Sequence, residues 1–222
     1  PWTRCKPPGQ ATPALTASTL AAAEVDELKM MSQYGIGYMQ LTVMKHDQLI
    51  EKHLAKAGLK DTKVTWAKLG AGAAANDALP AGGLPSAAAG TGPALILWDR
   101  TRGNADVRGV AALSSMPNLL VTRNPKVKTL KDFGESDRIA MAGAGSSVQT
   151  TYLQMATAKE FGIDNYKKLA PLMVRLPHPE GLRALLSGSG EITSQFTSPP
   201  FQNQALENPG IHTVLNSYHV IG

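Results

Sequence analysis

The residues best suited to hold a ligand follow two glycine turns, one in each half of the chain. In the second half, a short apolar run precedes Gly143-Ala144-Gly145, and Ser146 and Ser147 then open an amphipathic segment. In the first half, an apolar run leads into Gly70-Ala71-Gly72. A helix that starts after such a turn presents free backbone N–H groups and a partial positive charge, which suit a carboxylate, sulfonate or phosphate. The alternative for each turn is an ordinary strand-to-helix connection with an N-cap serine.

Neither turn completes a known phosphate motif. Residues 70–75 fit the dinucleotide pattern G-x-G-x-x-[GA], but that pattern also needs an acidic residue at the end of the next strand. The nearest acids are Asp77, inside the predicted helix, and Asp99, after a second helix. Residues 143–148 end in Val148 and lack a Walker lysine. A nicotinamide-dependent oxidoreductase therefore stays a minor alternative.

A third candidate is the stretch from Phe196 to Phe201, FTSPPF. Thr197 and Ser198 supply two hydroxyls at the end of a predicted strand, and a Pro-Pro turn flanked by phenylalanines follows them. Apolar walls with a few placed polar groups are typical of small-molecule pockets. The alternative is a rigid surface turn.

Evidence for catalysis is poor, so we expect no enzyme, no catalytic residue, no metal site and no cofactor. No HExxH sequence, Gly-x-Ser-x-Gly elbow or paired catalytic carboxylates occur. Cys5 is the single cysteine, which excludes an internal disulfide or a cysteine zinc site. His46 and His53 fit a solvated helix face, and we interpret His178, between two prolines, as structural.

The whole chain has the patterning of an α/β protein. Its 222 residues carry a formal charge of +5, but the densest basic cluster, residues 123–131, has no interleaved aromatics, which argues against nucleic-acid binding. Short apolar runs alternate with amphipathic segments, which predicts parallel sheets with helical crossovers. The predicted strands are residues 28–35, 63–70, 107–115, 118–124, 138–143, 168–176, 191–201 and 212–222. The predicted helices are residues 39–59, 73–83, 93–103, 146–161, 178–190 and 202–210.

Several long segments resemble the substrate-binding proteins of ABC importers of the nitrate, sulfonate and taurine class. Residues 28–59, 64–82 and 90–104 resemble the N-terminal lobe of that family, including VTWAKLGAGAAANDALPAG. Residues 127–156 (VKTLKDFGESDRIAMAGAGSSVQTTYLQMA) and 185–210 resemble its second lobe. The order of these segments over residues 25–222 is more specific than any single motif.

The resemblance implies a type II periplasmic-binding-protein fold: two lobes, each a mostly parallel sheet flanked by helices, which close on a ligand. It divides the chain into a tail or signal remnant at 1–23, an N-terminal lobe at 24–119, a second lobe at 120–215 and a crossover segment at 216–222. The ligand would be held from both lobes. The residues that it implies are Gln33, Tyr34, Gly37, Tyr38, Gly70, Ala71, Gly72, Thr91, Gly92, Ser146, Ser147, Thr197 and Ser198.

The chain departs from the family pattern in three places. Residues 83–86, Gly-Leu-Pro-Ser, stand where the family has a Gly-x-Ile/Val-Asp strand, so the ligand wall at residues 86–90 is in doubt. Residues 1–23 match nothing in the family, although Arg4, Lys6 and an Ala-Ala-Ala run are similar to the end of a secretory signal. The C-terminal part of the first lobe is expected to be missing.

The expected function is that of a periplasmic receptor that binds a small anionic or zwitterionic solute and delivers it to a membrane permease. We expect a monomer that does not bind nucleic acid. Two alternatives share the fold: an enzyme of the pyrimidine-precursor type, which would need a cysteine-rich motif, and a ligand-sensing module of a signalling system.

Overall fold

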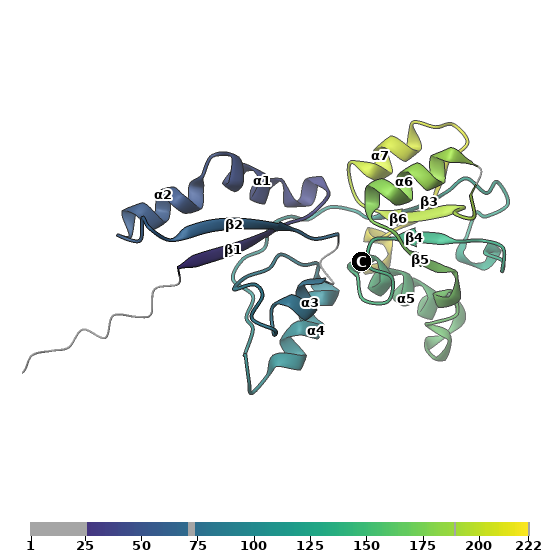
Figure 1. The fold of residues 1–222 in the computed structure, drawn as a ribbon. Coiled ribbons are helices and arrows are strands. Elements are labelled where there is room, and N and C mark those ends of the chain that lie inside the picture. Colours follow the sequence, from purple (N-terminus) through teal and green to yellow (C-terminus); the bar gives the residue numbers. More distant parts are fainter. Residues whose placement is uncertain (1–25, 71–73, 189, 222) are drawn as a thin grey trace, which may run out of the picture.

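The computed structural model describes residues 26–70, 74–188 and 190–221, and these form two α/β lobes that lie side by side (Figure 1). In the first lobe, the parallel strands β1 (Glu27–Ser32) and β2 (Lys63–Lys68) pair with Met30 opposite Trp66. The helices α1 (Met39–His46) and α2 (Leu49–Lys56) cover one face of this pair. The helices α3 (Ala75–Ala78) and α4 (Thr91–Thr101) lie on the other side (Figure 1).

The predicted single helix over residues 39–59 is wrong, because the chain breaks between α1 and α2. Gln48 takes a left-handed conformation with φ 52° and ψ 42°. The apolar spacing does not mark the break, because Leu41, Met44 and Leu49 stand at i, i+3 and i+8, which all fit one face of a continuous helix.

The predicted strand over residues 107–115 is also wrong. The segment has no regular secondary structure, and residues 108–115 are all exposed. Val110 is 98% exposed. A strand needs a partner and a face to bury, and a sequence of Ala, Ser and Gly around Val110 offers little apolar side chain for either purpose. The segment instead runs over the surface between the two lobes.

The second lobe contains a five-stranded mixed sheet in the order β5-β4-β6-β3-β7. Its strands are β3 (Leu119–Thr122), β4 (Ile139–Met141), β5 (Met173–Arg175), β6 (Ser194–Thr197) and β7 (His212–Asn216). β4 is parallel to β5 and β6, and β3 is antiparallel to β6 and β7. Four strands therefore point the same way, which confirms the predicted α/β class with a mostly parallel sheet.

Helices cover both faces of this sheet. The long helix α5 (Val148–Phe161) lies on one face, and α6 (His178–Ser187) and α7 (Phe201–Leu206) lie on the other (Figure 1). The short helix α8 (Tyr218–Ile221) packs against α5. Single 3-10 turns occur at Ile36–Tyr38, Leu130–Asp132, Ile163–Asn165 and Ala170–Leu172.

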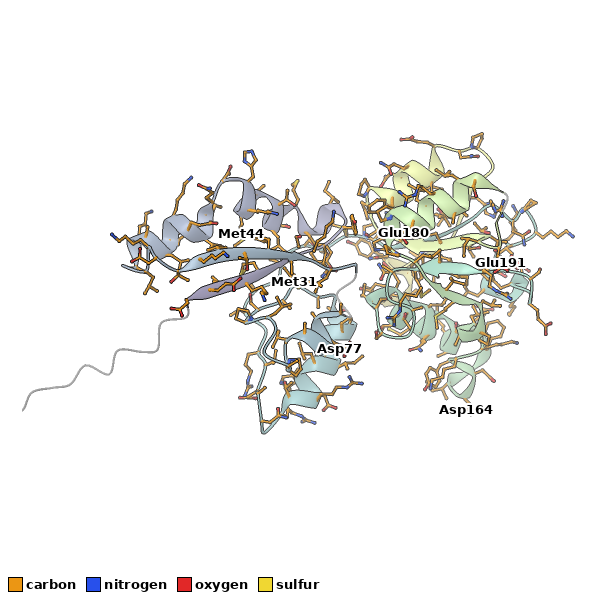
Figure 2. All side chains as sticks on the ribbon, viewed as in Figure 1. Met31, Met44, Asp77, Asp164, Glu180 and Glu191 are labelled. Carbon is orange, nitrogen blue, oxygen red and sulfur yellow. The ribbon has the colours of Figure 1, made fainter. Side chains whose placement is uncertain are left out.

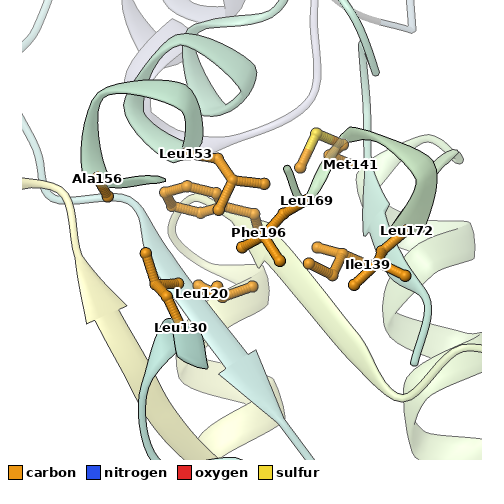
Figure 3. Packing of buried hydrophobic residues seen from close by; sticks show 9 residues of the cluster. All are labelled: Leu120, Leu130, Ile139, Met141, Leu153, Ala156, Leu169, Leu172 and Phe196. Carbon is orange, nitrogen blue, oxygen red and sulfur yellow. The ribbon is translucent and has the colours of Figure 1, made fainter. Parts of the chain in front are cut away.

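Phe196 lies at the centre of the core between the sheet and α5. It is fully buried and packs in one cluster with Leu120, Ile139 and Leu153 (Figure 3). The opposite face of the sheet packs Val121 and Ala140 against the helices α6 and α7. Side chains alternate along β6, so Phe196 faces α5 while its neighbours Gln195 and Thr197 face α6.

Strand direction decides which ends of the two lobes meet. Glu180, in the first turn of α6, lies on the side of the second lobe that faces the first, and Glu191, just before β6, lies at the opposite end (Figure 2). The carboxyl ends of β4, β5 and β6 therefore point toward the first lobe. In parallel α/β sheets, the loops at this edge carry the binding site.

Candidate functional site

The loops at the carboxyl ends of the strands bring most of the predicted ligand residues to the boundary between the lobes. From the second lobe come the turn before α5, the start of α6 and the turn after β6. From the first lobe come the loop after β1, the turn after β2 and the start of α4. Within the described residues, these loops come together across the boundary at three points.

The first point joins the loop after β1 to the turn after β6. The backbone N–H of Ile36 donates to the carbonyl oxygen of Pro199 at 3.0 Å. Gly35 has a φ of +108° and approaches so closely that a Cβ there would lie 3.2 Å from Ser198 Oγ. Glycine adopts this positive φ without strain, and its missing side chain permits the approach. The predicted loop at residues 33–38 and the predicted residue Ser198 are thus neighbours.

The second point joins the amino-terminal ends of α4 and α5. A Cβ on Gly90 would lie 2.7 Å from Val148 Cβ, and a Cβ on Gly92 would overlap the hydroxyl of Thr151. The predicted pair Thr91 and Gly92 therefore lies against the helix that follows Ser146 and Ser147. Gly92 is buried in this contact, whereas Thr91 is exposed.

The third point joins the turn after β2 to the start of α6. A Cβ on Gly70 would lie 3.8 Å from Pro177 Cγ, which is ordinary van der Waals contact. The two other predicted residues of this turn, Ala71 and Gly72, lie outside the described residues. No sequence pattern pointed to Pro177, because its partner Gly70 is more than a hundred positions away.

Gln33 and Tyr38 fix the shape of the loop after β1. Gln33 Nε2 donates to the carbonyl of Ala88, which ties the loop to residues 86–90. Burial raises the pKa of the Tyr38 hydroxyl, and a hydrogen bond with Gln33 acts in the opposite direction. Residues 86–90 form no strand, in keeping with the family strand that the sequence lacks. Gly37 is buried beside Ser114 and Met116.

Ser146 and Ser147, which follow the glycine turn before α5, differ in their surroundings. Ser147 is the N-cap of α5: its Oγ accepts from the backbone N–H of Thr150 at 3.2 Å and lies 3.1 Å from Thr150 Oγ1. Ser147 is 4% exposed. Ser146 is half-buried, and its hydroxyl makes no hydrogen bond to any residue that the structure describes. Ser146 is therefore the freer donor of the two.

The hydroxyl of Thr197 forms a hydrogen bond to another side chain of the protein. Its Oγ1 lies 2.8 Å from Nδ1 of His178, the first residue of α6. The His178 ring stacks on Phe201, with centroids 5.5 Å apart and an angle of 17° between the planes. Burial lowers the pKa of His178 from 6.5 to about 4, so the ring is neutral near pH 7. Sequence reasoning missed this pair, since the partners are separated by the whole of α6.

Two cations stand at the boundary. Lys68 ends β2, and its Nζ lies 4.1 Å above the ring centroid of Tyr34, one of the predicted ligand residues. Arg175 ends β5, and its Nη2 donates to the carbonyl of Ala144 in the glycine turn at 3.2 Å. Arg123 and Arg138 bond instead to backbone carbonyls at the opposite edge of the sheet. Lys68 had no sequence signal, because only the paired strands place it beside Tyr34.

No group of three or more His, Cys, Asp or Glu side chains in residues 26–70, 74–188 and 190–221 is arranged to hold a metal ion. An apolar hollow of about 440 Å³ lies between residues of α1 and α2 in the first lobe. Its lining residues are Met44, Leu49, Ile50, His53, Leu54 and Ala57, and none of them is a predicted ligand residue. Among the described helices, none is long and apolar enough to cross a membrane.

Several solved structures have a similar fold. No protein-family model matches the chain, and no curated protein matches it in sequence. The alkanesulfonate-binding protein SsuA from Xanthomonas axonopodis pv. citri, bound to MOPS, is similar over 88% of this chain, with a TM-score of 0.66 and 20% identity. The periplasmic aliphatic sulphonate-binding protein SsuA from Escherichia coli is similar over 87%, with a TM-score of 0.55 and 16% identity.

A third similar structure is the ligand-binding component of an ABC-type import system from Staphylococcus aureus, with a TM-score of 0.54 and 16% identity over 87% of this chain. The chain spans 62%, 61% and 62% of the lengths of these three proteins. The chain therefore shares the two-lobed fold of these binding proteins, which confirms the fold that the resemblance in the sequence implied.

Proposed function

We propose that this chain is the solute-binding part of an ABC importer that captures a small organic anion, of the sulfonate, taurine or nitrate kind, between its lobes. In this proposal the protein acts as a monomer in the periplasm and delivers its ligand to a membrane permease. Two of the similar structures are named as sulfonate-binding proteins, which supports this ligand class. None of the three is named as an enzyme.

The observation that carries the proposal is the meeting of two sheet edges. The hydrogen bond from Ile36 to Pro199 joins the loops after β1 and β6, and the packing of Gly90 on Val148 joins the starts of α4 and α5. A ligand held by both sets of loops would favour the closed arrangement of the lobes over an open one. Closure of two domains around a ligand is a common device of binding proteins.

Charge at this boundary favours an anion. Lys68 and Arg175 form no ion pair with a carboxylate among the residues that the structure describes. The first turn of α5 adds a helix amino terminus, which carries a partial positive charge. Glu180 is the acidic residue of the first turn of α6, and it is exposed. Asp77, in the first turn of α3, is a second exposed carboxylate near the turn after β2, so the two cations, unpaired among the described residues, together with the helix end are what favour an anion.

The proposal is tested by thermal unfolding and calorimetry of the full chain with ethanesulfonate, taurine, MOPS and nitrate, with ethylene glycol as a neutral control. A ligand at about one hundred times its Kd stabilises a protein by about 2.7 kcal/mol. We expect stabilisation by at least one anion and none by ethylene glycol. A folded sample that no anion stabilises would refute the proposal.

Two charge variants test the ligand class further. Lys68→Met and Arg175→Gln should each weaken binding of the anion about tenfold, in line with the loss of one charge-assisted hydrogen bond. Lys63→Met, at the opposite end of the same strand, and Arg183→Gln, on an exposed turn of α6, are the matched controls. Equal losses in the variants and in their controls would mean that only overall charge matters.

A further inference from the structure

A buried polar cluster lies beneath the first turn of α6. Gln195 and Thr197 are both 0% exposed and point to the same face of β6, and His178 above them is 6% exposed. Gln195 Nε2 donates to the backbone carbonyl of His178 at 2.9 Å. Thr197 Oγ1 lies 2.8 Å from His178 Nδ1. The backbone and the side chain of His178 are thus each held by one residue of β6.

Thr197 also decides which ring nitrogen of His178 carries the proton. His178 Nδ1 is the only hydrogen-bond partner of the Thr197 hydroxyl among the described residues. If Nδ1 carried the proton, the hydroxyl hydrogen of Thr197 would be buried without an acceptor, at a cost of about 1–3 kcal/mol. The hydroxyl therefore donates to Nδ1, and in the neutral ring the proton lies on Nε2.

Nε2 is then a donor without a partner. It makes no hydrogen bond to any residue in the described part of the chain. Stacking on Phe201 and the bond to Thr197 hold the ring in one orientation. An N–H group fixed in this way gains from an acceptor, and the described residues supply none.

The surroundings of His178 show where such an acceptor would come from. Its neighbour in sequence, Pro177, lies against Gly70 of the first lobe. The residue after its partner Thr197 is Ser198, which lies against Gly35 of the first lobe. His178 thus stands between two of the three points where the lobes touch.

We propose that His178 is a ligand-contacting residue, whose Nε2–H donates a hydrogen bond to an oxygen of the solute bound between the lobes. This inference rests on the proposed function and deepens it, because it assigns the second lobe an uncharged donor beside the cation Arg175. An uncharged donor suits a sulfonate or carboxylate oxygen and does not change its strength between about pH 6 and pH 8. Thr197 acts as a positioning residue in this scheme.

The test uses the full chain with MOPS or ethanesulfonate as the probe, whichever binds the wild-type protein. His178→Phe keeps a ring for the stack on Phe201 but removes both nitrogens, and we expect its affinity to fall about tenfold. Thr197→Val should weaken binding by a smaller factor, and Thr197→Ser should restore it. His219→Phe, at an exposed position of α8, is the control and should bind like the wild type.

Nitrogen-15 NMR of the wild-type histidines gives a second readout that needs no variant to fold. We expect the Nε2–H form of His178 in the free protein and a shift of its Nε2 proton when the probe is added. An Nδ1–H ring, an unmoved proton or undiminished affinity of His178→Phe would each overturn the inference while the proposed function stands. Wild-type protein that binds none of the anions would overturn both.

Discussion

The backbone N–H of Ile36 and the carbonyl oxygen of Pro199 lie 3.0 Å apart and form a hydrogen bond between the two lobes. Ile36 follows β1 in the first lobe, and Pro199 follows β6 in the second. Both partners of this bond are backbone groups, so the side chains at these positions do not predict it. It depends instead on Gly35, which lets the two loops approach.

A side chain at Gly90 should hold the lobes apart. Gly90 has φ −68° and ψ 163°, which alanine adopts freely, but the new Cβ would lie 2.7 Å from Val148 Cβ. Overpacking of this kind costs about 1–3 kcal/mol, and separation of α4 from α5 would relieve it. We expect Gly90→Ala to increase the radius of gyration in X-ray scattering and to weaken anion binding.

Gly109→Ala is the matched control for that change, because a Cβ at Gly109 would meet nothing within 4 Å. It should leave both the scattering curve and the affinity as they are in the wild type. If Gly90→Ala scatters and binds like Gly109→Ala, then the contact between α4 and α5 has no part in closure.

Variants of Ser146 and Ser147, the two serines before α5, should have separate effects on stability and on ligand binding. Ser147→Ala removes the N-cap of α5 and should lower the free energy of unfolding by about 1 kcal/mol. Ser146→Ala removes a hydroxyl that bonds to none of the described residues, so stability should stay within about 0.5 kcal/mol. Urea unfolding measures the first effect, and calorimetry with the anion shows whether Ser146 contributes to affinity. Equal unfolding curves for the two variants would contradict the capping role.

The sequence predicted the second lobe better than the first, for physical reasons. Glycine ends α5 at Gly162 and α6 at Gly188, and both take a positive φ, so local chemistry marks these helix ends. The exposed segment at residues 107–115 has no such marker, and alternation alone suggested a strand there. The break between α1 and α2 has no such marker either, because the apolar spacing stays helical through Gln48, the residue that takes the left-handed conformation.

For the candidate site, the sequence predicted the loops but not the contacts that form within and between them. Lys68 meets Tyr34 only because β1 and β2 pair, and His178 meets Thr197 only because α6 packs on β6. We interpreted His178 as structural because two prolines flank it. These prolines do not indicate its hydrogen bond to Thr197, 19 positions further along the chain. The ligand contacts of the predicted residues and the domain boundaries stay predictions.

Gln202 should stabilise the segment that carries the chain from the first lobe into the second. Its Oε1 accepts from the backbone N–H of Leu119 at 3.1 Å, and its Nε2 donates to the carbonyl of Pro117 at 3.3 Å. Gln202→Leu leaves both backbone groups without this partner and should cost about 1–3 kcal/mol in urea unfolding. Gln204→Leu, on an exposed turn of the same helix, should cost little. Faster hydrogen exchange at Leu119 in Gln202→Leu alone would locate the loss, and equal costs in the two variants would contradict it.

His178 should make the protein sensitive to acid. Burial holds its pKa at about 4 in the folded protein, against 6.5 for an unperturbed histidine, so the unfolded chain takes up a proton first as the pH falls. The stabilising contribution is therefore complete above about pH 6.5 and is lost progressively as the pH falls toward 4. The gap between the two pKa values corresponds to about 3 kcal/mol.

Carboxylates also titrate in this range, so the comparison that isolates His178 is between variants. The free energy of unfolding, measured in urea from about pH 8 to about pH 4.5, should fall more steeply in the wild type than in His178→Phe, with a difference of about 2–3 kcal/mol over the range. His219→Phe removes an exposed histidine and should follow the wild-type slope. If His178→Phe loses stability with acid as steeply as the wild type, the ring of His178 is not held neutral by burial, and the Nε2 donor assigned to it would have to be charged at mildly acidic pH.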